Sequence, residues 1–407
     1  MKILVQKFGG TSVATPEARR RVIEKIINAR KQGYRLVVVV SAMGRRGAPY
    51  ATDTLKGLLE ASGSNVSPRE MDLILSCGEI ISGTVLTGSL QAAGFKAIFL
   101  TGAQAGIITD NRFGNATIRR VDPGRILTHL EEDKIVVVAG FQGITEDGEI
   151  TTIGRGGSDT TAAALGVALD AEAVEIYTDV DGIKTADPRI VSDARTLDTV
   201  TYNEICQLAH EGARVVHPRA VEIAMQKNIP LKIKCTFNDE PGTVVTGAGV
   251  FKEGGATILN GRVITGITQI PGLTQLRINT GALEDKTLQV KMLKALARAD
   301  ISIDFINISP EAMVFTVKDE VSSRAVRIIE DMKIPVAVKK GCAKVAVVGA
   351  GMTGVPGVMA NIVEALAEEG IEILESADSY TTIWCLVEEA KMEKAVQALH
   401  RKFNLGK

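Results

Sequence analysis

The sequence predicts an α/β protein with a mostly parallel central sheet, followed by two ferredoxin-like repeats. Three observations predict this fold. Apolar β-branched runs alternate with amphipathic helical stretches through the first half of the chain, as in parallel sheets covered by helices on both faces. The composition shifts toward glycine and turn-forming residues near residue 238. Beyond that point, sequence features recur at an offset of 70 residues, which indicates two copies of one unit.

The first half of the chain supplies the predicted sheet. The predicted elements are strands at 2–6, 35–40, 135–139 and 175–178, and helices from about Pro16 and over 159–169. Continuous β-branched runs such as 35–40 are typical of strands buried on both faces. The helix from Pro16 carries an apolar stripe at helical spacing. Ligands of such folds bind at the carboxyl ends of strands, so the loops after these strands are the candidate sites.

Residues 263–407 contain the internal repeat. The strand-like segment 313–317 recurs at 383–387, and each copy reads strand, helix, strand, strand, helix, the pattern of a split βαβ unit. The first copy continues into a further strand at 335–338, whereas the sequence ends after the second helix of the second copy. We expect the missing edge strand to be absent or supplied from elsewhere, with 243–251 as a candidate donor.

Charge and composition exclude several classes of function. Lys and Arg number 47 and Asp and Glu 48, for a net charge of −1, so no electrostatic footprint for nucleic acid is predicted. Aromatic residues make up 4% of the chain, which leaves little for base stacking. Four histidines argue against a His-based metal centre. Glycine is abundant, at 40 of 407 residues, against a usual share of about 7%. We therefore expect chemistry built from glycine loops, basic side chains and carboxylates.

The cysteines and the hydropathy pattern predict a cytoplasmic protein. Five cysteines, an odd number without a C-x-x-C pair, are typical of reduced thiols rather than a disulfide framework or a zinc site. No uninterrupted apolar run reaches the roughly 18 residues of a membrane span. The N-terminus resembles a strand rather than a signal peptide. We expect no membrane partner.

The first glycine loop, Lys7-Phe8-Gly9-Gly10, is a candidate phosphate site. Paired glycines after a strand let backbone N–H groups approach an anion, and the next helix adds its positive end. Lys7 would supply a point charge. An ordinary tight turn with a solvated lysine is the alternative, and the Walker A pattern occurs nowhere in the chain.

The second glycine loop, at 154–161 (GRGGSDTT), points more sharply to a ligand. Asp159 could simply cap the following helix, but a cap does not explain Arg155 flanked by glycines. A guanidinium on a glycine loop suits bidentate binding of a carboxylate or phosphate.

Three further positions are weaker candidates. The strand-end carboxylates in 177–189 (YTDVDGIKTADPR) could bind Mg²⁺ or ribose hydroxyls, although Asp-Gly and Asp-Pro also favour turns. Ser41 ends a buried strand. Glu79 opens an apolar stretch, where a buried carboxylate needs a partner. A substrate ammonium or a structural Lys or Arg would be such a partner.

One motif points to a different class of protein. Residues 349–354 (GAGMTG) fit G-x-G-x-x-G after a strand, the dinucleotide fingerprint. Only 53 residues follow it, too few for a dinucleotide-binding domain, and the first repeat lacks these glycines. We do not predict an oxidoreductase.

Together, the motifs resemble those of the aspartate kinases of the amino-acid kinase family. The matching segments, in order, are 7–13 (KFGGTSV), 39–44 (VVSAMG), 77–79 (CGE), 139–143 (AGFQG), 154–161, 178–183 (TDVDGI), 185–189 (TADPR) and 212–219 (GARVVHPR). With the two C-terminal repeats, the resemblance covers essentially the whole chain, and the shared order of the motifs is far more specific than any one of them. The segments 45–53 (RRGAPYATD) and 376–384 (SADSYTTIW) look most like isozymes of Bacillus-type bacteria.

The resemblance implies both an architecture and a reaction. It implies an amino-acid-kinase-type sandwich and two regulatory ACT domains. The expected boundaries are 1–240 for the kinase domain, 241–262 for the connection, 263–341 for the first ACT domain and 342–407 for the second. The implied reaction is ATP + L-aspartate → ADP + 4-phospho-L-aspartate, the first step toward lysine, threonine, methionine and diaminopimelate. Its nucleophile is already ionised, so positioning and charge stabilisation suffice without a strong base.

The resemblance also assigns roles to residues of this sequence. The implied catalytic residues are Lys7, Arg155 and Asp159. The implied aspartate-binding residues are Ser41, Thr52, Glu79, Arg155 and Ser158. The implied nucleotide-binding residues are Lys7, Phe8, Gly9, Gly10, Gly156, Gly157, Thr178, Asp179, Lys184, Asp187, Arg189 and Arg214. The implied cofactors are ATP and Mg²⁺, the ion being held mainly by the nucleotide phosphates without a protein metal site.

Regulation is implied as well, with two departures from the family pattern. ACT domains imply a homodimer or larger oligomer that binds an amino-acid effector at an interface and is feedback-inhibited. Lysine, threonine and diaminopimelate all remain open as effectors. Arg214 stands where the family usually has lysine, and the two are not equivalent in geometry. The first repeat lacks the Pro-Gly turn that the second has at 356–357, so the effector-binding repeat stays open.

Two other functions remain as alternatives. Another amino-acid kinase, acting for example on glutamate or N-acetylglutamate, would usually lack tandem ACT repeats. A catalytically inactive, ACT-based amino-acid sensor would not need intact Lys7, Glu79, Arg155 and Asp159.

Overall fold

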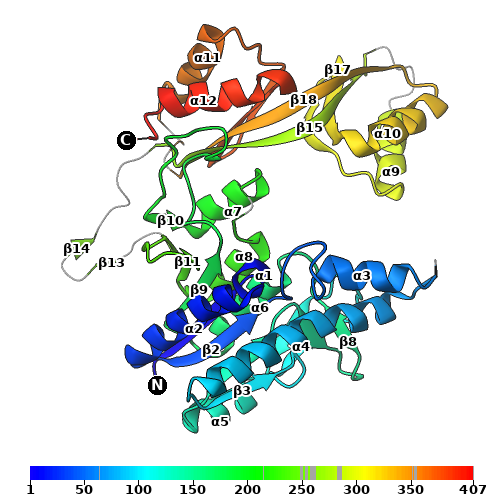
Figure 1. The fold of residues 1–407 in the computed structure, drawn as a ribbon. Coiled ribbons are helices and arrows are strands. Elements are labelled where there is room, and N and C mark those ends of the chain that lie inside the picture. The colour runs from blue at the N-terminus through cyan, green and yellow to red at the C-terminus, as the bar shows by residue number, and fades with distance from the viewer. Residues whose placement is uncertain are drawn as a thin grey trace. The chain divides into compact units, whose positions relative to one another are not determined.

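The computed structural model describes residues 1–63, 65–213, 215–247, 263–281, 287–350, 352 and 355–406, with the backbone of 251–252 and 255–256. The chain divides into two compact units (Figure 1). The first unit comprises 1–183, 196–210 and 214–260, and the second comprises 184–195, 211–213 and 261–407. The candidate residue Arg214 and the fingerprint glycines Gly351 and Gly354 lie outside the described residues.

An eight-stranded sheet forms the centre of the first unit. Its strands are β1 (Ile3–Phe8), β2 (Arg35–Val40), β3 (Ala97–Leu100), β6 (Ile135–Ala139), β9 (Ala173–Thr178), β10 (Thr199–Thr201), β11 (Leu231–Cys235) and β12 (Thr243–Thr246). The strand order is β10-β12-β11-β9-β1-β2-β6-β3. Every pairing is parallel except that of β11 with β12. The predicted mostly parallel sheet is therefore confirmed, and the strands predicted at 35–40 and 135–139 have those bounds.

Helices cover both faces of this sheet. The helices of the first unit are α1 (Gly10–Val13), α2 (Pro16–Lys31), α3 (Thr52–Glu60), α4 (Pro68–Ala92), α5 (Gly124–Glu131), α6 (Gly157–Ala168), α7 (Tyr202–His210) and α8 (Pro218–Gln226). On one face, Ile26 of α2 and Leu86 of α4 share a buried cluster with Ala173 of β9. On the other, Gly166 of α6 lies against Val174, the next residue along β9, and side chains alternate between faces along a strand.

The long helix α4 passes beside the sheet and a smaller one. It contacts β2, β3, β6 and also β8 of a four-stranded sheet. That sheet has the order β5-β4-β7-β8, with bounds β4 (Ile107–Thr109), β5 (Ile118–Val121), β7 (Gln142–Ile144) and β8 (Ile150–Thr152). Among the described residues, α4 alone is long and apolar enough to cross a membrane, and half of its apolar window is buried inside the protein. The core helix of a folded domain has the same composition.

The second unit is built on a six-stranded sheet. Its strands are β15 (Gly266–Asn279), β16 (Asp304–Ile308), β17 (Ala312–Lys318), β18 (Val336–Val348), β19 (Glu375–Asp378) and β20 (Thr382–Glu388), in the order β16-β17-β15-β18-β20-β19. Its helices are α9 (Thr287–Arg298), α10 (Asp319–Asp331), α11 (Val358–Glu368), η1 (Glu389–Lys391) and α12 (Met392–Lys402). Two short strands that belong to the first unit, β13 (Phe251–Lys252) and β14 (Gly255–Ala256), pair with each other.

The two repeats share their two longest strands, β15 and β18, which run side by side (Figure 1). In the first repeat, the later part of β15 pairs with the start of β18; in the second, residues 266–270 of β15 pair with 344–348. The edge strand missing from the second repeat is therefore 266–270. The prediction that 243–251 supplies it is wrong, because β12 pairs with β10 and β11. A bend at Gly272, with φ +72°, and a register shift after Ile270 let one strand serve both repeats.

Residues 184–195, which follow the strand-end motif TDVDGI, pack into the core of the second unit. Ala186 and Val191 share a buried cluster with Ile362 of α11. The hydroxyl of Thr185 lies 2.9 Å from Nε2 of His400 on α12. Residues 184–195 are therefore part of the second unit, whereas 179–183 belong to the first.

Candidate active site

The strand ends of β1, β2 and β9 meet at the first glycine loop. The N–H of Gly9 donates to the carbonyl of Tyr177 (3.2 Å), and the N–H of Gly44 donates to the carbonyl of Gly10 (3.0 Å). A Cβ on Gly10 would lie 2.7 Å from the carbonyl oxygen of Ala42, a separation that side chains do not adopt. The backbone approach therefore requires glycine at position 10.

Lys7 and Asp159 form an ion pair beside this loop. The ammonium lies 2.6 Å from Oδ1 of Asp159, and both side chains are 12% exposed. The N-cap of α6 is Gly156, and no side chain caps the helix. The alternative that Asp159 merely caps the helix is therefore wrong: its carboxylate pairs with the lysine. A lysine held at a helix N-terminus beside paired glycines is suited to an anion.

The second glycine loop presents Arg155 to solvent. Gly154 and Gly156 have φ of +81° and +66°, the left-handed region that favours glycine. A Cβ on Gly156 would also run into the ring of His217. Arg155 is exposed and makes no hydrogen bond or ion pair with any residue that the structure describes. Its guanidinium is available for an anionic ligand.

Glu79 is a buried carboxyl group with one unused oxygen. Its side chain is on α4, and the residue is 2% exposed. Oε1 accepts from the N–H of Ala42 (3.0 Å), while Oε2 has no hydrogen-bond partner among the described residues. Burial raises the pKa of Glu79 to about 8, and the hydrogen bond from Ala42 opposes this only in part. The close approach depends on Gly78, whose Cβ would lie 2.8 Å from that of Ala42. A buried carboxyl oxygen without a donor suits an ammonium group.

The other candidate residues of the first unit surround these groups. The N–H of Ser41 donates to the carbonyl of Phe8 (3.1 Å), and Thr52 is the first residue of α3. Ser158 is buried, with its hydroxyl 2.8 Å from where a Cβ on Gly140 would be. Phe8 is fully buried and stacks on a tyrosine ring at 4.7 Å, so only its backbone is available to a ligand.

The candidate nucleotide residues are divided between the units. In the first unit, the hydroxyl of Thr178 donates to Asp179 (3.1 Å). Gly157 begins α6. In the second, Arg189 pairs with Asp187 at 2.6 Å, and this guanidinium lowers the pKa of Asp187. Lys184 belongs to the same segment, 184–195, of the second unit.

Asp72 was missed in the sequence. It is fully buried on α4, and its oxygens accept from the N–H of Gly114 (2.9 Å) and from the N–H and hydroxyl of Thr152 (2.8 and 2.7 Å). Thr152 ends β8, three residues before Arg155. Asp72 therefore holds the strand from which the arginine loop departs. The available signal was its spacing of seven residues from Glu79, which puts both on one face of a helix.

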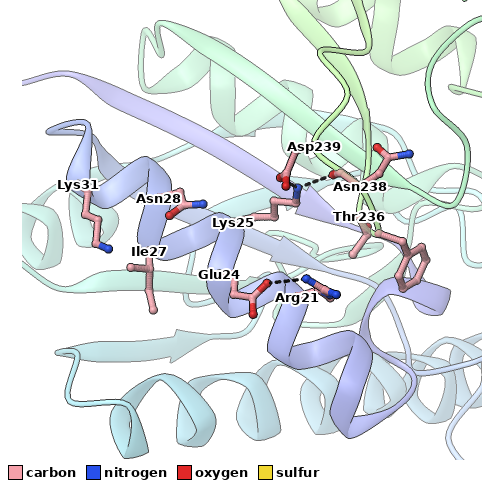
Figure 2. A pocket seen from close by; sticks show the side chains of 10 residues that line it. Arg21, Glu24, Lys25, Ile27, Asn28, Lys31, Thr236, Asn238 and Asp239 are labelled. Atoms are coloured by element: carbon pink, nitrogen blue, oxygen red, sulfur yellow. Dashed lines mark hydrogen bonds and ion pairs between the residues drawn. The ribbon is translucent and has the colours of Figure 1, made fainter.

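A separate cavity of about 330 Å³ lies between α2 and the segment after β11 (Figure 2). None of the candidate residues lines it. Figure 2 shows that two cationic side chains lining the cavity form ion pairs with carboxylates that also line it: Arg21 with Glu24, and Lys25 with Asp239. We assign no role to this cavity.

Comparisons with known proteins identify the family of the chain. The model of the amino acid kinase family matches residues 2–235, and an ACT domain model matches 337–401. The chain is 52% identical to aspartokinase 1 of Bacillus subtilis over 407 residues, the whole of both chains. It resembles E. coli aspartokinase III in complex with aspartate and ADP, with a TM-score of 0.78 and 26% identity over 98% of this chain and 99% of that one. It also resembles the same enzyme in complex with lysine and aspartate, with a TM-score of 0.77 and 26% identity over 99% and 100% of the two chains. The chain therefore belongs to the amino acid kinase family and, within it, to the aspartokinases.

Proposed function

We propose that this aspartokinase binds L-aspartate between Glu79 and Arg155 and transfers the γ-phosphoryl group of ATP to it over the first glycine loop. The observation that carries this proposal is the juxtaposition of Lys7 with Asp159 beside Gly9 and Gly10. The same strand ends carry Ser41 and Ala42, and the Ala42 N–H binds Glu79. Groups suited to an anion and to an ammonium thus lie at one edge of one sheet.

Glu79 and Arg155 recognise the two charged ends of the amino-acid moiety. The unused Oε2 of Glu79 accepts from the substrate ammonium, which stabilises the ionised carboxylate. Arg155 binds a substrate carboxylate, the geometry that a guanidinium matches bidentately. Ser41, Thr52 and Ser158 complete the aspartate site.

The transfer step relies on charge and positioning. The acceptor carboxylate of aspartate is ionised at neutral pH, so no side chain needs to remove a proton from it. Lys7 and the N–H groups of the glycine loop other than that of Gly9, which is bonded to Tyr177, stabilise the negative charge of the transferring phosphoryl group. Asp159 holds the Lys7 ammonium in place. The side chains of Thr178, Asp179, Lys184, Asp187, Arg189 and Arg214 and the loop residues Phe8, Gly156 and Gly157 bind the nucleotide.

Mg²⁺ enters with ATP and neutralises phosphate charge. Among the described residues, no group of three or more His, Cys, Asp or Glu side chains is placed to hold a metal ion. Mg²⁺ commonly keeps several waters and binds through phosphates with one or two carboxylates, and Asp159 is a carboxylate of this site. We assign the ion mainly to the nucleotide phosphates.

The second unit supports a proposal of feedback regulation in an oligomer. E. coli aspartokinase III is known in complex with lysine and aspartate, and we extend amino-acid effector binding to the ACT repeats of this chain. The sheet edge β16 exposes Ile306 and Ile308, at 45% and 55%, which suits an interface with a second copy. We propose a homodimer or larger assembly. The five cysteines are free, as expected in the cytoplasm, where we place the enzyme.

One experiment tests the proposed reaction against its alternatives. ADP release is measured with Mg-ATP and a panel containing aspartate, glutamate and N-acetylglutamate, and acyl phosphate is trapped as its hydroxamate. The proposal predicts aspartate-dependent hydroxamate. Hydroxamate formed from glutamate or N-acetylglutamate instead would show that the protein is another amino-acid kinase. If no amino acid of the panel stimulated ADP release or formed hydroxamate, kinase activity on these amino acids would be contradicted.

A further inference from the structure

The loop between β2 and α3 is anchored on the glycine pair. The N–H of Gly44 donates to the carbonyl of Gly10. Gly44 and Gly47 both adopt left-handed backbone, with φ of +88° and +94°, and the N–H of Ala48 donates to the carbonyl of Arg45 (2.8 Å). The loop therefore turns tightly, and the backbone of Arg45 is held one residue from a contact with Gly10.

The side chain of Arg45 extends to the other side of the glycine pair. Its Nη2 lies 2.5 Å from Oδ2 of Asp179, which follows β9. The carbonyl of Tyr177, two residues earlier, binds the N–H of Gly9. The backbone of Arg45 is thus anchored at Gly10, and its guanidinium at the strand end that contacts Gly9. With its backbone and its guanidinium anchored in this way, Arg45 lies beside the loop that we assign to the phosphates.

The ion pair between Arg45 and Asp179 is weak enough for Arg45 to exchange Asp179 for another anion. The two side chains are 72% and 42% exposed, and ion pairs so accessible to water contribute little, because both groups are well solvated and lose side-chain entropy. A nucleotide polyphosphate carries more negative charge than one carboxylate and accepts two parallel N–H bonds from a guanidinium. Arg45 would therefore bind phosphate in preference to Asp179.

We propose that Arg45 is a further phosphate-binding residue, which leaves Asp179 when nucleotide binds and contacts the polyphosphate beside Lys7. The inference rests on the proposed function, since it takes the first glycine loop as the phosphate site. Lys7 is mostly buried and paired with Asp159, whereas Arg45 approaches from the exposed loop. Arg45 would thus add a second cationic side chain, from the solvent side, to the charge that stabilises the transferring group.

The test compares Arg45→Ala with Arg46→Ala in the full-length protein. Arg46 is the adjacent exposed arginine and contacts no hydrogen-bond or ion-pair partner among the described residues, so its substitution controls for the change in net charge and for effects on the loop. KM is measured for ATP and for aspartate, and Kd is measured for ADP and for AMP. Loss of a charge-assisted contact predicts that Arg45→Ala raises KM for ATP and Kd for ADP roughly tenfold. AMP affinity, KM for aspartate and Tm should stay within about twofold of the Arg46→Ala values.

Two outcomes would overturn the inference. In the first, Arg45→Ala matches Arg46→Ala for both ATP and ADP. In the second, KM for aspartate rises while ADP affinity is unchanged, which places the guanidinium on the acceptor instead. An unaltered protein that forms no aspartyl hydroxamate would reject the proposed function itself, a result distinguishable from either.

Discussion

At the scale of single residues, Glu79 predicts a pH dependence of aspartate binding. Burial raises the pKa of Glu79 to about 8 in the absence of ligand, so the group is mostly neutral at pH 6 and cannot pair with the substrate ammonium. Ionisation as pH rises restores the pair. KM for aspartate should therefore fall as pH rises from 6 to 8, by roughly tenfold per pH unit at the lower end, and level off above the pKa.

Steady-state kinetics at several pH values measure this effect. Glu79→Gln is the matched control, because it keeps the shape but cannot ionise, and its KM for aspartate should be high and insensitive to pH. If KM for aspartate depended on pH equally in wild type and in Glu79→Gln, Glu79 would not be the residue that binds the substrate ammonium.

Asp72 predicts a separate change in aspartate binding. Asp72→Asn replaces an acceptor oxygen with an N–H₂ group that faces the donors of Gly114 and Thr152. The loss of an acceptor weakens the hydrogen bonds that fix the end of β8. We expect KM for aspartate to rise about tenfold, with KM for ATP nearly unchanged. Thr152→Ser, which keeps the hydroxyl, should remain close to wild type.

A double-mutant cycle tells positioning from general destabilisation. If Asp72 acts by orienting the loop of Arg155, Asp72→Asn should have little further effect on aspartate kcat/KM in an Arg155→Ala background. Full additivity of the two changes, measured with Tm for each variant, would mean that Asp72 serves stability alone.

At the scale of elements, strand ends and helix starts were predictable, but shared strands were not. The loops after β1 and β2 and before α6 carry glycines and charged groups whose types alone point to anion binding. The pairing of 266–270 with the second repeat depends on a bend within one long strand. The sequence marks a turn there at Pro271-Gly272, but it does not show which repeat each part of the strand joins. The spacing of Asp72 from Glu79 indicates a shared helix face, but the role of Asp72 could not be predicted, because the sequence does not show which donors its carboxylate binds.

Lys344 on β18 predicts an effect on the stability of the second unit. Its ammonium lies 3.0 Å from Glu211 and 2.7 Å from Asp304, and the side chains of Lys344 and Glu211 are 5% and 8% exposed. Lys344→Met leaves Glu211 buried without its cation, which should destabilise the fold by about 3–5 kcal/mol. Thermal unfolding of the full chain measures this loss.

The control restores neutrality at the same site. Lys344→Met combined with Glu211→Gln removes the unpaired charge, so the double variant should recover part of the lost Tm. If Lys344→Met unfolds at the wild-type temperature, the ion pair makes no net contribution.

At the scale of the whole molecule, the segment 184–195 predicts how regulation reaches the nucleotide. Its candidate nucleotide residues belong to the second unit, where Thr185 bonds His400 of α12. An effector that changes the packing of the repeats can therefore change nucleotide binding, a coupling between separate sites. We expect lysine, threonine or diaminopimelate to inhibit the full chain, and Thr185→Val to raise the effector concentration needed for half inhibition severalfold.

Inhibition curves for each effector, measured on the wild-type protein and on the variants Thr185→Val and Thr185→Ser, test this coupling. The serine variant keeps the hydroxyl and should behave as wild type. Deletion of 263–407 would be a less direct test, because it would expose Ala186 and Val191, which are buried in the core of the second unit. Equal half-inhibition in Thr185→Val and wild type would exclude this route.

The role of Lys7 in phosphoryl transfer is decided by the rate of aspartyl hydroxamate formation by Lys7→Ala at saturating ATP and aspartate. If Lys7 stabilises the transferring phosphoryl group, kcat should fall by about 100-fold or more, while KM for aspartate changes little. A kcat within about threefold of wild type would contradict the mechanism, because transfer would then proceed without the charge that the site is built to supply.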